Sequence, residues 1–425
     1  MNKIEGDVLI IGAGAAGMSA ALTLAGAGKK VILCERDALL GGILNQCIHN
    51  GFGLHYFKEE LTGPEFAGRL TERVAEEPLI TVFTSITVTG LTGGGGGVSA
   101  EGYGKSQGVC GFTAKAAVLA MGSRERNRGS IPIPGTRPAG VFTAGTAQRL
   151  INIEGIIPGR RIVIAGSGDI GLIMARRLVW SGLEVLGVVE IQPYPAGLTR
   201  NIVQCLNDFS IPLYLSHEIS AIYGRDRVCG VEIKPVSKFG GGSEKPFFLS
   251  CDTLLLSVGL IPENELSKKA GIGLDSVTGG PKVDSRFMTD VQGIFSCGNV
   301  LHIHDLVDYC SMEAEECARG VLRYLENSGA GDKINERTDD QINVKPGPNI
   351  RYAVPQSISR GKDATVSFRS LIVENDCRLS VKSGGKVLLE KKLRHVQPSE
   401  MVRLSIAGDL TADCKVDDEL EVILS

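Results

Sequence analysis

Two short groups of glycines, each lying between a predicted strand and a predicted helix, have the clearest chemical meaning in the sequence. The first group is Gly12, Gly14 and Gly17, and the next predicted strand ends in Glu35. Such glycines let the backbone turn tightly and approach a pyrophosphate, whose charge the start of the helix stabilises. The acidic residue would accept a hydrogen bond from a ribose hydroxyl. We therefore predict a dinucleotide at this turn.

The same pattern returns at Gly166, Gly168 and Gly171, and here the following strand ends in Glu190. Two such turns in one chain predict two dinucleotides. A carboxylate at this position accepts a hydrogen bond from a 2′-hydroxyl and repels a 2′-phosphate, so the sequence favours NAD(H) over NADP(H). The alternative is that Glu190 is a solvated strand end. The other residues expected beside the two turns are Ala15, Ala16, Arg36, Asp169 and Ile170.

The elements that must position these turns are two βαβ units. An apolar run at 7–11, a helical pattern up to Ala27 and a strand at 30–34 form the first, and the pattern repeats from Arg160. A β-rich stretch at 79–119 is interrupted by the glycine run 93–97, which predicts a hairpin loop. Further strands are expected at 253–259 and 293–299, and a helix at about 308–326.

These elements predict an α/β fold with two Rossmann-like domains, one inserted in the other, and a C-terminal all-β module. We expect SGGK, residues 383–386, to form a hairpin turn in that module. The expected boundaries are 1–125 with 255–328 for the first domain, 126–254 for the second, 329–349 for a linker and 350–425 for the β module.

Composition excludes several classes of function. Lys plus Arg number 45 and Asp plus Glu 48, so the net charge of −3 provides no field for nucleic acid or an anionic membrane. Eleven cysteines without a CxxC pair indicate reduced thiols and a cytoplasmic protein. The N-terminus lacks the pattern of a secretory signal, and no apolar run is long enough to predict a membrane span.

The sequence resembles the flavoproteins with two dinucleotide-binding domains, the pyridine nucleotide-disulfide oxidoreductase superfamily, over about residues 5–326. The similarity lies in DVLIIGAGAAG with Glu35, the doublet Gly41-Gly42, KAAVLAMGSRER, GSGDIG and TDVQGIFSCGN. It implies FAD at the first turn, with Gly122 nearby, and NAD(P)H at the second. It also implies that Gly298 and Asn299 contact the flavin ribitol, although Asp is usual in the family where this chain has Asn299.

The resemblance also shows what the chain lacks. Disulfide reductases of this superfamily carry CxxxxC after the glycine doublet, and those two positions are here Leu44 and His49. Cys47 lies between them as a single cysteine, so we expect no disulfide reduction, because a thiolate needs a second sulfur to shuttle two electrons. Cys47, with His49 nearby, remains a candidate redox thiol that cycles through a sulfenate, or else it is a packed core residue.

A closer resemblance is to the FAD/NAD subunit found with bacterial type-2 glycerol-3-phosphate dehydrogenases. It is carried by GGILNQCIHNGFGLHYFKEELTGPEF, VFTAGTAQRLINIEG, GLTRNIVQCL and CGNVLHIHDLVD. It implies an electron-transfer subunit that works with a partner dehydrogenase and a small cysteine-containing protein, and we expect an oligomer. The alternatives are a stand-alone NADH oxidase or peroxidase that uses Cys47, and a non-catalytic protein that senses NADH.

One more group of candidate residues, His302, His304, Asp305 and Asp308, lies before the helix expected at 308–326. His-x-His beside an acid has the spacing of metal ligands, but we assign no metal. We expect the helix start to face the flavin, with His302 or His304 supplying a proton, since an imidazole titrates near neutrality. The alternative is that these side chains only cap the helix and bond a neighbouring domain.

Overall fold

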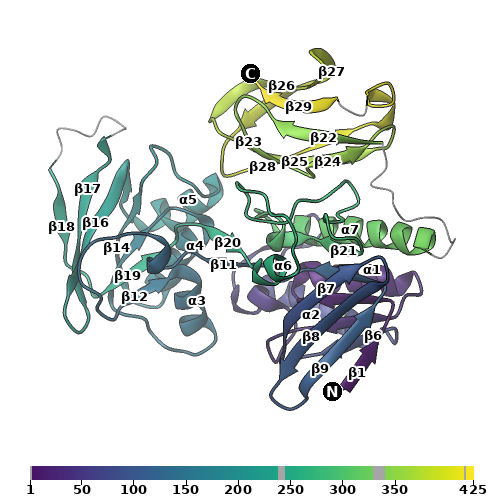
Figure 1. The fold of residues 1–425 in the computed structure, drawn as a ribbon. Helices are drawn as coiled ribbons and strands as arrows, with labels where there is room; N and C mark the ends of the chain where they lie inside the picture. Colours follow the sequence, from purple (N-terminus) through teal and green to yellow (C-terminus); the bar gives the residue numbers. More distant parts are fainter. Residues whose placement is uncertain (1, 238–244, 329–339, 416–417) are drawn as a thin grey trace. The chain divides into compact units, whose positions relative to one another are not determined.

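The computed structural model describes residues 2–237, 245–328, 340–415 and 418–425 (Figure 1). The chain divides into two compact units, Met1–Ser123 with Pro262–Ser425, and Arg124–Ile261. Each unit contains a five-stranded sheet with helices beside it, which confirms the predicted α/β class. Within the described part of the chain, no helix combines the length and the apolar character that a membrane span requires.

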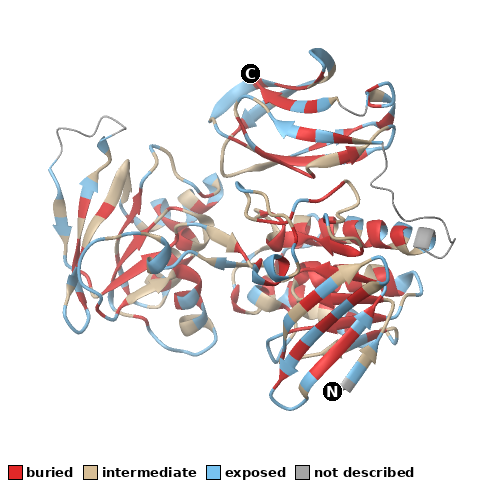
Figure 2. Cartoon of the chain, in the orientation of Figure 1, coloured by how far each residue is buried: buried red, intermediate tan, exposed pale blue. Residues whose placement is uncertain are grey.

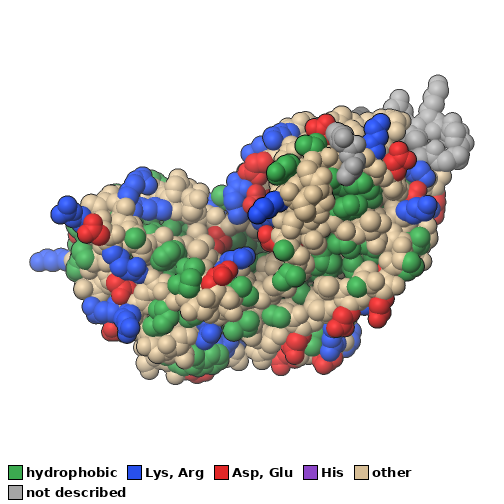
Figure 3. All heavy atoms as spheres, turned by 90° about the horizontal axis from the view of Figure 1, so that it is seen from below, with side chains coloured by type: hydrophobic (Ala, Val, Ile, Leu, Met, Phe, Trp, Pro, Cys, Tyr) green, Lys and Arg blue, Asp and Glu red, His purple; other side chains and the backbone are tan. Residues whose placement is uncertain are grey.

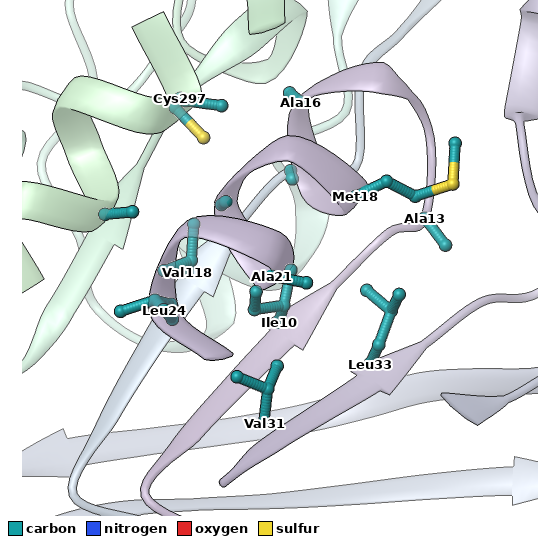
Figure 4. Packing of buried hydrophobic residues seen from close by; sticks show 14 of the residues in the cluster. Ile10, Ala13, Ala16, Met18, Ala21, Leu24, Val31, Leu33, Val118 and Cys297 are labelled. Carbon is teal, nitrogen blue, oxygen red and sulfur yellow. The ribbon is translucent and has the colours of Figure 1, made fainter. Parts of the chain in front are cut away.

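The first unit is built on a parallel sheet with the strand order β21-β10-β2-β3-β6. Its central strands are apolar on both faces and fully buried, as expected where helices cover a parallel sheet (Figure 2). Helix α1 packs against α7, and small residues of α1 such as Ala16 and Ala21 lie close to Cys297 and Val118 (Figure 4). The elements are β2 (Val8–Ile11), α1 (Ala15–Gly26), β3 (Val31–Cys34), α2 (Gly63–Glu76), β6 (Ile80–Phe83), β10 (Ala116–Leu119), β21 (Ile294–Ser296) and α7 (Val307–Ser328).

A second sheet of this unit, with the order β1-β9-β8-β7, follows from the β-rich stretch. Its hairpin between β7 and β8 pairs Gly94 with Gly97, so the hairpin loop predicted from the glycine run is confirmed. The elements are β1 (Asn2–Glu5), β7 (Ile86–Gly94), β8 (Gly97–Gly104) and β9 (Gly108–Ala114), with β4 (Asn50–Phe52), β5 (Leu61–Thr62) and α6 (Glu265–Lys269) elsewhere in the unit.

The C-terminal part of the first unit is a sandwich of a five-stranded and a three-stranded sheet with an apolar core. The predicted turn is confirmed, since Ser383 and Lys386 pair at the end of a hairpin. The five-stranded sheet contains β24 (Ser357–Ser359), β22 (Gln341–Pro346), β29 (Glu419–Leu424), β26 (Glu374–Ser383) and β27 (Lys386–Val396), and the other contains β23 (Ile350–Val354), β25 (Ala364–Ser370) and β28 (Met401–Ile406).

The linker expected at 329–349 requires a correction, because its last part is strand β22. Ile342 and Val344 point into the sandwich core while the polar residues between them face outward, and the strand pairs in parallel with β29. Only two apolar residues mark this strand in a polar stretch, which explains the error. The rest of the expected linker, residues 329–339, lies outside the described residues.

The second unit repeats the parallel sheet, with the order β12-β19-β13-β14-β15. A three-stranded antiparallel sheet, β16-β17-β18, accompanies it. The elements are β12 (Val141–Thr143), α3 (Ala144–Asn152), β13 (Arg161–Ala165), α4 (Asp169–Trp180), β14 (Glu184–Glu190), α5 (Thr199–Cys205), β15 (Leu213–Leu215), β16 (His217–Gly224), β17 (Val228–Pro235), β18 (Phe247–Leu249) and β19 (Thr253–Leu256).

Strand β19 corrects the expected boundary at 254/255. It was expected to complete the first domain, but it pairs with β12 and β13 in the sheet of the second unit. A strand that is apolar on both faces suits the centre of either parallel sheet, so its sequence does not specify which sheet it joins. The second unit therefore extends to Ile261, and β11 (Ser123–Glu125) pairs with β20 (Leu260–Pro262) where the chain passes between the units.

The charged side chains on the surface are mixed in sign, as the small net charge predicts. On the face that Figure 3 shows, Lys and Arg side chains lie among Asp and Glu side chains, with hydrophobic side chains between them.

Candidate functional site

The first glycine turn joins β2 to α1. Gly12 donates from its backbone N–H to the Cys34 carbonyl over 2.8 Å. Its φ is +101°, and a Cβ there would lie 2.4 Å from the Ala120 carbonyl oxygen, so the position requires glycine. Glu35 is buried, and its two carboxylate oxygens accept the Ala13 N–H at 2.8 Å and the Asp37 N–H at 2.9 Å.

This turn is suited to an anion. Among the described residues, no side chain caps the first N–H groups of α1, and no heavy atom lies within 4 Å of a Cβ built on Gly14. Open space above uncapped N–H groups at a helix start is what a pyrophosphate requires. The geometry of this turn therefore fits the pyrophosphate of the predicted FAD.

Three segments that are distant in the sequence meet at the start of α1. The Gly41 N–H donates to the Ala13 carbonyl at 2.9 Å. A Cβ on Gly298 would lie 2.8 Å from the Ala16 Cβ, so this strand end packs directly on the helix. Of the other predicted residues, Gly42 lies beside Gly14, and Gly17 lies against the Gly12 carbonyl. Gly122 follows β10, and its carbonyl accepts the Glu263 N–H. Arg36 is exposed and lies 3.9 Å from the Glu263 carboxylate.

The second turn repeats the first in detail. Gly166 donates to the Val189 carbonyl over 2.7 Å and has a φ of +91°. Glu190 is buried; one oxygen accepts the Ser167 N–H at 2.9 Å and its hydroxyl at 2.6 Å, and the other accepts the Gln192 N–H at 2.9 Å. Glu190 is therefore an ordered carboxylate that braces the turn, rather than a solvated strand end.

Gly168 precedes the helix after this turn, α4, and provides no side-chain cap for it. Asp169, its first residue, accepts hydrogen bonds from the Leu198 N–H at 2.8 Å and the Asn201 amide at 2.7 Å. Gly168 and Ile170 are partly exposed there, and Gly171 packs on Ser257, whose hydroxyl accepts its N–H at 3.1 Å. The geometry of this turn resembles that of the first, except that one N–H at its helix start is bonded to Ser257.

Cys47 lies in a setting that suppresses thiol chemistry. Its Sγ donates to the Ile43 carbonyl at 3.3 Å, and burial raises the pKa of the thiol to about 12. A reactive cysteine needs a thiolate and access to solvent, and this thiol has neither. The ring of His49 packs against Phe52 with centroids 4.9 Å apart, and its Nδ1 lies 3.0 Å from the Asn50 carbonyl oxygen. All eleven cysteines lie in the described part of the chain, where none of them forms a disulfide, and their reduced state stays a prediction.

His302 and His304 share one buried carboxylate, that of Glu313 on α7. Its Oε2 lies 2.6 Å from His302 Nε2 and 3.2 Å from His304 Nε2, and its Oε1 accepts the Gly298 N–H at 2.8 Å. His304 Nδ1 lies 3.0 Å from the His302 carbonyl oxygen and 3.3 Å from Asn299 Oδ1, both of which accept hydrogen bonds, and the Cys310 thiol also contacts this imidazole. This cluster of His302, His304 and Glu313 is called the imidazole–carboxylate cluster below.

Hydrogen-bond directions assign the charges of the imidazole–carboxylate cluster. Both nitrogens of His304 face acceptors, so both carry protons and the ring is a cation. Burial alone would lower the pKa of His304, but Cys310 and Glu313 beside it raise that pKa well above its ordinary value. Burial would raise the pKa of Glu313, but the two imidazoles hold it below its usual range. Burial lowers the pKa of His302, which stays neutral.

The same three side chains are close enough for one metal ion, since their donor atoms lie within 4.8 Å of one another. The ion pair between His304 and Glu313 accounts for this proximity by hydrogen bonding. In addition, His302 Nδ1 has no hydrogen-bond partner in the described part of the chain, whereas a histidine ligand commonly donates its second N–H to an acceptor. The assignment of no metal stays a prediction.

The two acidic residues of the predicted group have structural contacts. Asp308 is buried, and its carboxylate accepts backbone N–H groups of Gly53, His55 and Tyr56 at 2.8–3.1 Å. Asp305 pairs with Arg369 of the sandwich. Bonding to neighbouring segments, the alternative interpretation of this group, therefore applies to the two aspartates.

Sequence reasoning missed Glu313 and Arg369. Glu313 is eleven residues beyond His302 in a helix rich in acidic residues, and nothing in its own spacing distinguishes it from Glu315 or Glu316. The helical period gives no signal either: Glu313 is one turn from buried Cys317, but exposed Glu316, three residues away, is also its neighbour on the helix surface.

The chain is similar to known proteins in sequence. The family model described as pyridine nucleotide-disulphide oxidoreductase matches residues 6–314. An opine oxidase subunit of Rhizobium meliloti is 27% identical over 69% of this chain and 58% of its own length, and hydrogen cyanide synthase subunit HcnB of Pseudomonas protegens is 29% identical over 87% and 88%. The chain thus spans less than two thirds of the opine oxidase relative.

Among solved structures, thioredoxin reductase of T. acidophilum has a TM-score of 0.62 at 22% identity, covering 76% of this chain and 99% of that one. At this identity the likeness concerns the fold alone.

Proposed function

Because the chain belongs to the pyridine nucleotide-disulphide oxidoreductase family of FAD- and NAD(P)-binding oxidoreductases, we propose that it is the electron-transfer subunit of a dehydrogenase. It would move hydride equivalents between NAD(H) and FAD and exchange electrons with a partner dehydrogenase. The sequence resemblance favours a partner of the glycerol-3-phosphate dehydrogenase class, together with a small cysteine-containing protein. We also propose that it works in the cytoplasm and as an oligomer.

The observation that carries the proposal is the pair of matched turns. Glu35 and Glu190 each brace a glycine turn through one N–H inside the turn and one N–H two residues beyond the glutamate. When bound, FAD and NAD(H) supply the hydride chemistry, and the protein supplies orientation and electrostatics. The Glu190 carboxylate favours NADH, because it repels a 2′-phosphate.

The cysteine chemistry supports electron transfer without a dithiol. The two positions that carry sulfur in disulfide reductases of this superfamily are Leu44 and His49 here, and Cys47 is buried with a raised pKa. The names of the relatives point the same way, since HcnB and the opine oxidase relative are each one subunit of a larger enzyme. We therefore propose that the electrons pass to a partner protein rather than to a cysteine of this chain.

The imidazole–carboxylate cluster lies directly behind Gly298, whose N–H it binds. The His304 cation and the Glu313 carboxylate form an ion pair without net charge, and the carboxylate holds the Gly298 N–H. The proton of His304 is held by Glu313 rather than exposed to solvent, so we propose that the cluster fixes the backbone of the FAD-binding turn in place of the predicted proton transfer.

An anaerobic titration of the purified holoprotein with NADH and with NADPH tests the proposal. We expect NADH to bleach the flavin absorbance stoichiometrically and NADPH to bind at least about tenfold more weakly, the scale of one charge-assisted hydrogen bond. Failure of NADH to bleach a bound flavin would contradict the proposal and favour the NADH-sensing alternative.

Substitution of Cys47 distinguishes the proposed electron-transfer subunit from a stand-alone oxidase or peroxidase. Cys47→Ala should leave flavin reduction and turnover with an artificial acceptor within about twofold of wild type, because the thiol is not ionised at neutral pH. Cys229→Ala, at an exposed thiol, is the matched control. Loss of oxygen or peroxide turnover in the Cys47 variant alone would support the oxidase interpretation instead.

A further inference from the structure

The loop between Gly298 and α7 is held by the C-terminal sandwich of the same unit. Arg369 on β25 donates to the Ile303 carbonyl at 3.0 Å and forms an ion pair with Asp305. Both charged side chains are largely buried, with exposed fractions of 11% and 15%. A second guanidinium nitrogen of Arg369 donates to the Ser399 carbonyl at 2.6 Å, so the arginine is fixed at both ends.

Other sandwich residues strengthen this contact. The Met401 N–H donates to the second Asp305 oxygen at 2.6 Å, so the sandwich satisfies both oxygens of that carboxylate. Tyr352 lies edge-on to the His302 ring with centroids 6.1 Å apart, and it joins Val354, Leu301 and Val283 in one apolar cluster. The sandwich thus contacts the loop in two ways: Arg369 and Met401 bind the Asp305 carboxylate, and Tyr352 and Val354 pack against Leu301.

The loop also determines the orientation of Asn299. The His304 N–H donates to Asn299 Oδ1 at 3.0 Å, and Cys310 Sγ lies 3.5 Å from the same oxygen. A backbone N–H can only donate, so the atom facing it must be the amide oxygen, and the amide nitrogen is directed elsewhere as a donor. The loop residues on each side of Ile303, the residue that Arg369 holds, are His302 and His304.

We propose that the C-terminal sandwich is a clamp on the flavin site and that Arg369 is a positioning residue, which holds the His302–Asp305 loop so that Asn299 presents its amide nitrogen to the bound cofactor. The inference rests on the proposed FAD site at Gly298 and Asn299. It assigns to the sandwich a role within this chain, where the sequence showed no chemistry for it.

Hydrogen exchange of the full-length protein, followed by mass spectrometry, tests the clamp. In Arg369→Gln, we expect peptides that cover 298–306 to exchange about tenfold to a hundredfold faster, because the Asp305 carboxylate loses its buried partner. Asp305→Asn should have the same effect while leaving the Arg369 bonds inside the sandwich intact. Arg378→Gln, which removes an exposed ion pair of the sandwich, is the matched control and should not change exchange in the loop.

A second measurement distinguishes positioning from mere stability. FAD should dissociate from Arg369→Gln and from Asp305→Asn about tenfold faster than from the wild type, and Arg369→Lys, which keeps the charge, should recover part of the loss. If hydrogen exchange at 298–306 is unchanged in Arg369→Gln, the proposal is wrong. It is also wrong if exchange in β26 and β29 accelerates equally, because Arg369 would then stabilise the sandwich as a whole. If the protein binds no FAD, the proposed function fails while the exchange result still decides whether the clamp exists.

Discussion

Replacing Glu313 by glutamine should reverse the effect of one buried histidine on the pH dependence of stability. In the wild type, His304 has a raised pKa, so its contribution to stability is present below the ordinary histidine value and is lost as pH rises through the folded value. Without the Glu313 carboxylate, Cys310 still raises the pKa of His304, and we expect burial, the largest single influence on that pKa, to outweigh it, so that His304 becomes neutral in the folded protein. The variant then loses stability as pH falls through the ordinary histidine pKa, about 6.5.

The magnitude follows from the proton count. From the ordinary histidine pKa up to the raised pKa of His304, the folded wild type binds one more proton at His304 than the folded variant, whereas the unfolded chains bind equal numbers. The two proteins should therefore differ by about one proton per chain in the protons exchanged on unfolding. Equivalently, the slopes of their unfolding free energies should differ by about 1.4 kcal/mol per pH unit.

The assay is unfolding in weakly buffered guanidinium with the proton uptake or release recorded at several pH values, which requires no two-state assumption. Glu316→Gln, on the same helix but exposed and paired with Arg319, is the control and should match the wild type. The same proton count in Glu313→Gln as in the wild type would refute the reasoning. Cys310, the other group that raises the His304 pKa, would then be what holds the proton.

Three further predictions concern the two glycine turns and the buried thiols. Glu190→Gln should weaken NADH binding about tenfold and weaken NADPH binding less, measured by anaerobic titration of the flavin; equal losses for both nucleotides would contradict a role in selectivity. Gly12→Ala should yield protein with little bound FAD and a stability loss of about 1–3 kcal/mol, because the φ of Gly12 is +101° and the new Cβ would clash with the Ala120 carbonyl. The control is Gly96→Ala, where no described atom would contact the new Cβ, and it should change neither the FAD content after purification nor the melting temperature. Alkylation of the native protein should label Cys229 well before Cys47, as peptide mapping would show, because only the former is exposed and burial raises the pKa of the latter to about 12; rapid labelling of Cys47 would contradict its buried setting.

The first turn shows how much of this protein local sequence could predict. The first glycine turn and Glu35 belong to one continuous strand–turn–helix–strand unit, so the hydrogen bond from the Ala13 N–H to Glu35 follows from the spacing of residues close in the chain. The same reasoning applied to Gly166 and Glu190, and the family match supports both units. Strand β19 was misplaced because a strand buried on both faces carries no mark of the sheet it joins.

The amino-acid sequence by itself determined the two dinucleotide turns, the glycine doublet and the missing dithiol, because each depends on residue types at fixed short spacing. Only the tertiary structure decided that Glu313 binds both imidazoles and that Arg369 holds their loop from the sandwich. The second of these contacts joins residues more than sixty positions apart, where chain spacing carries no information and packing alone brings the charges together. Burial then sets what those charges do, since a carboxylate and an imidazole removed from water retain charge only as partners.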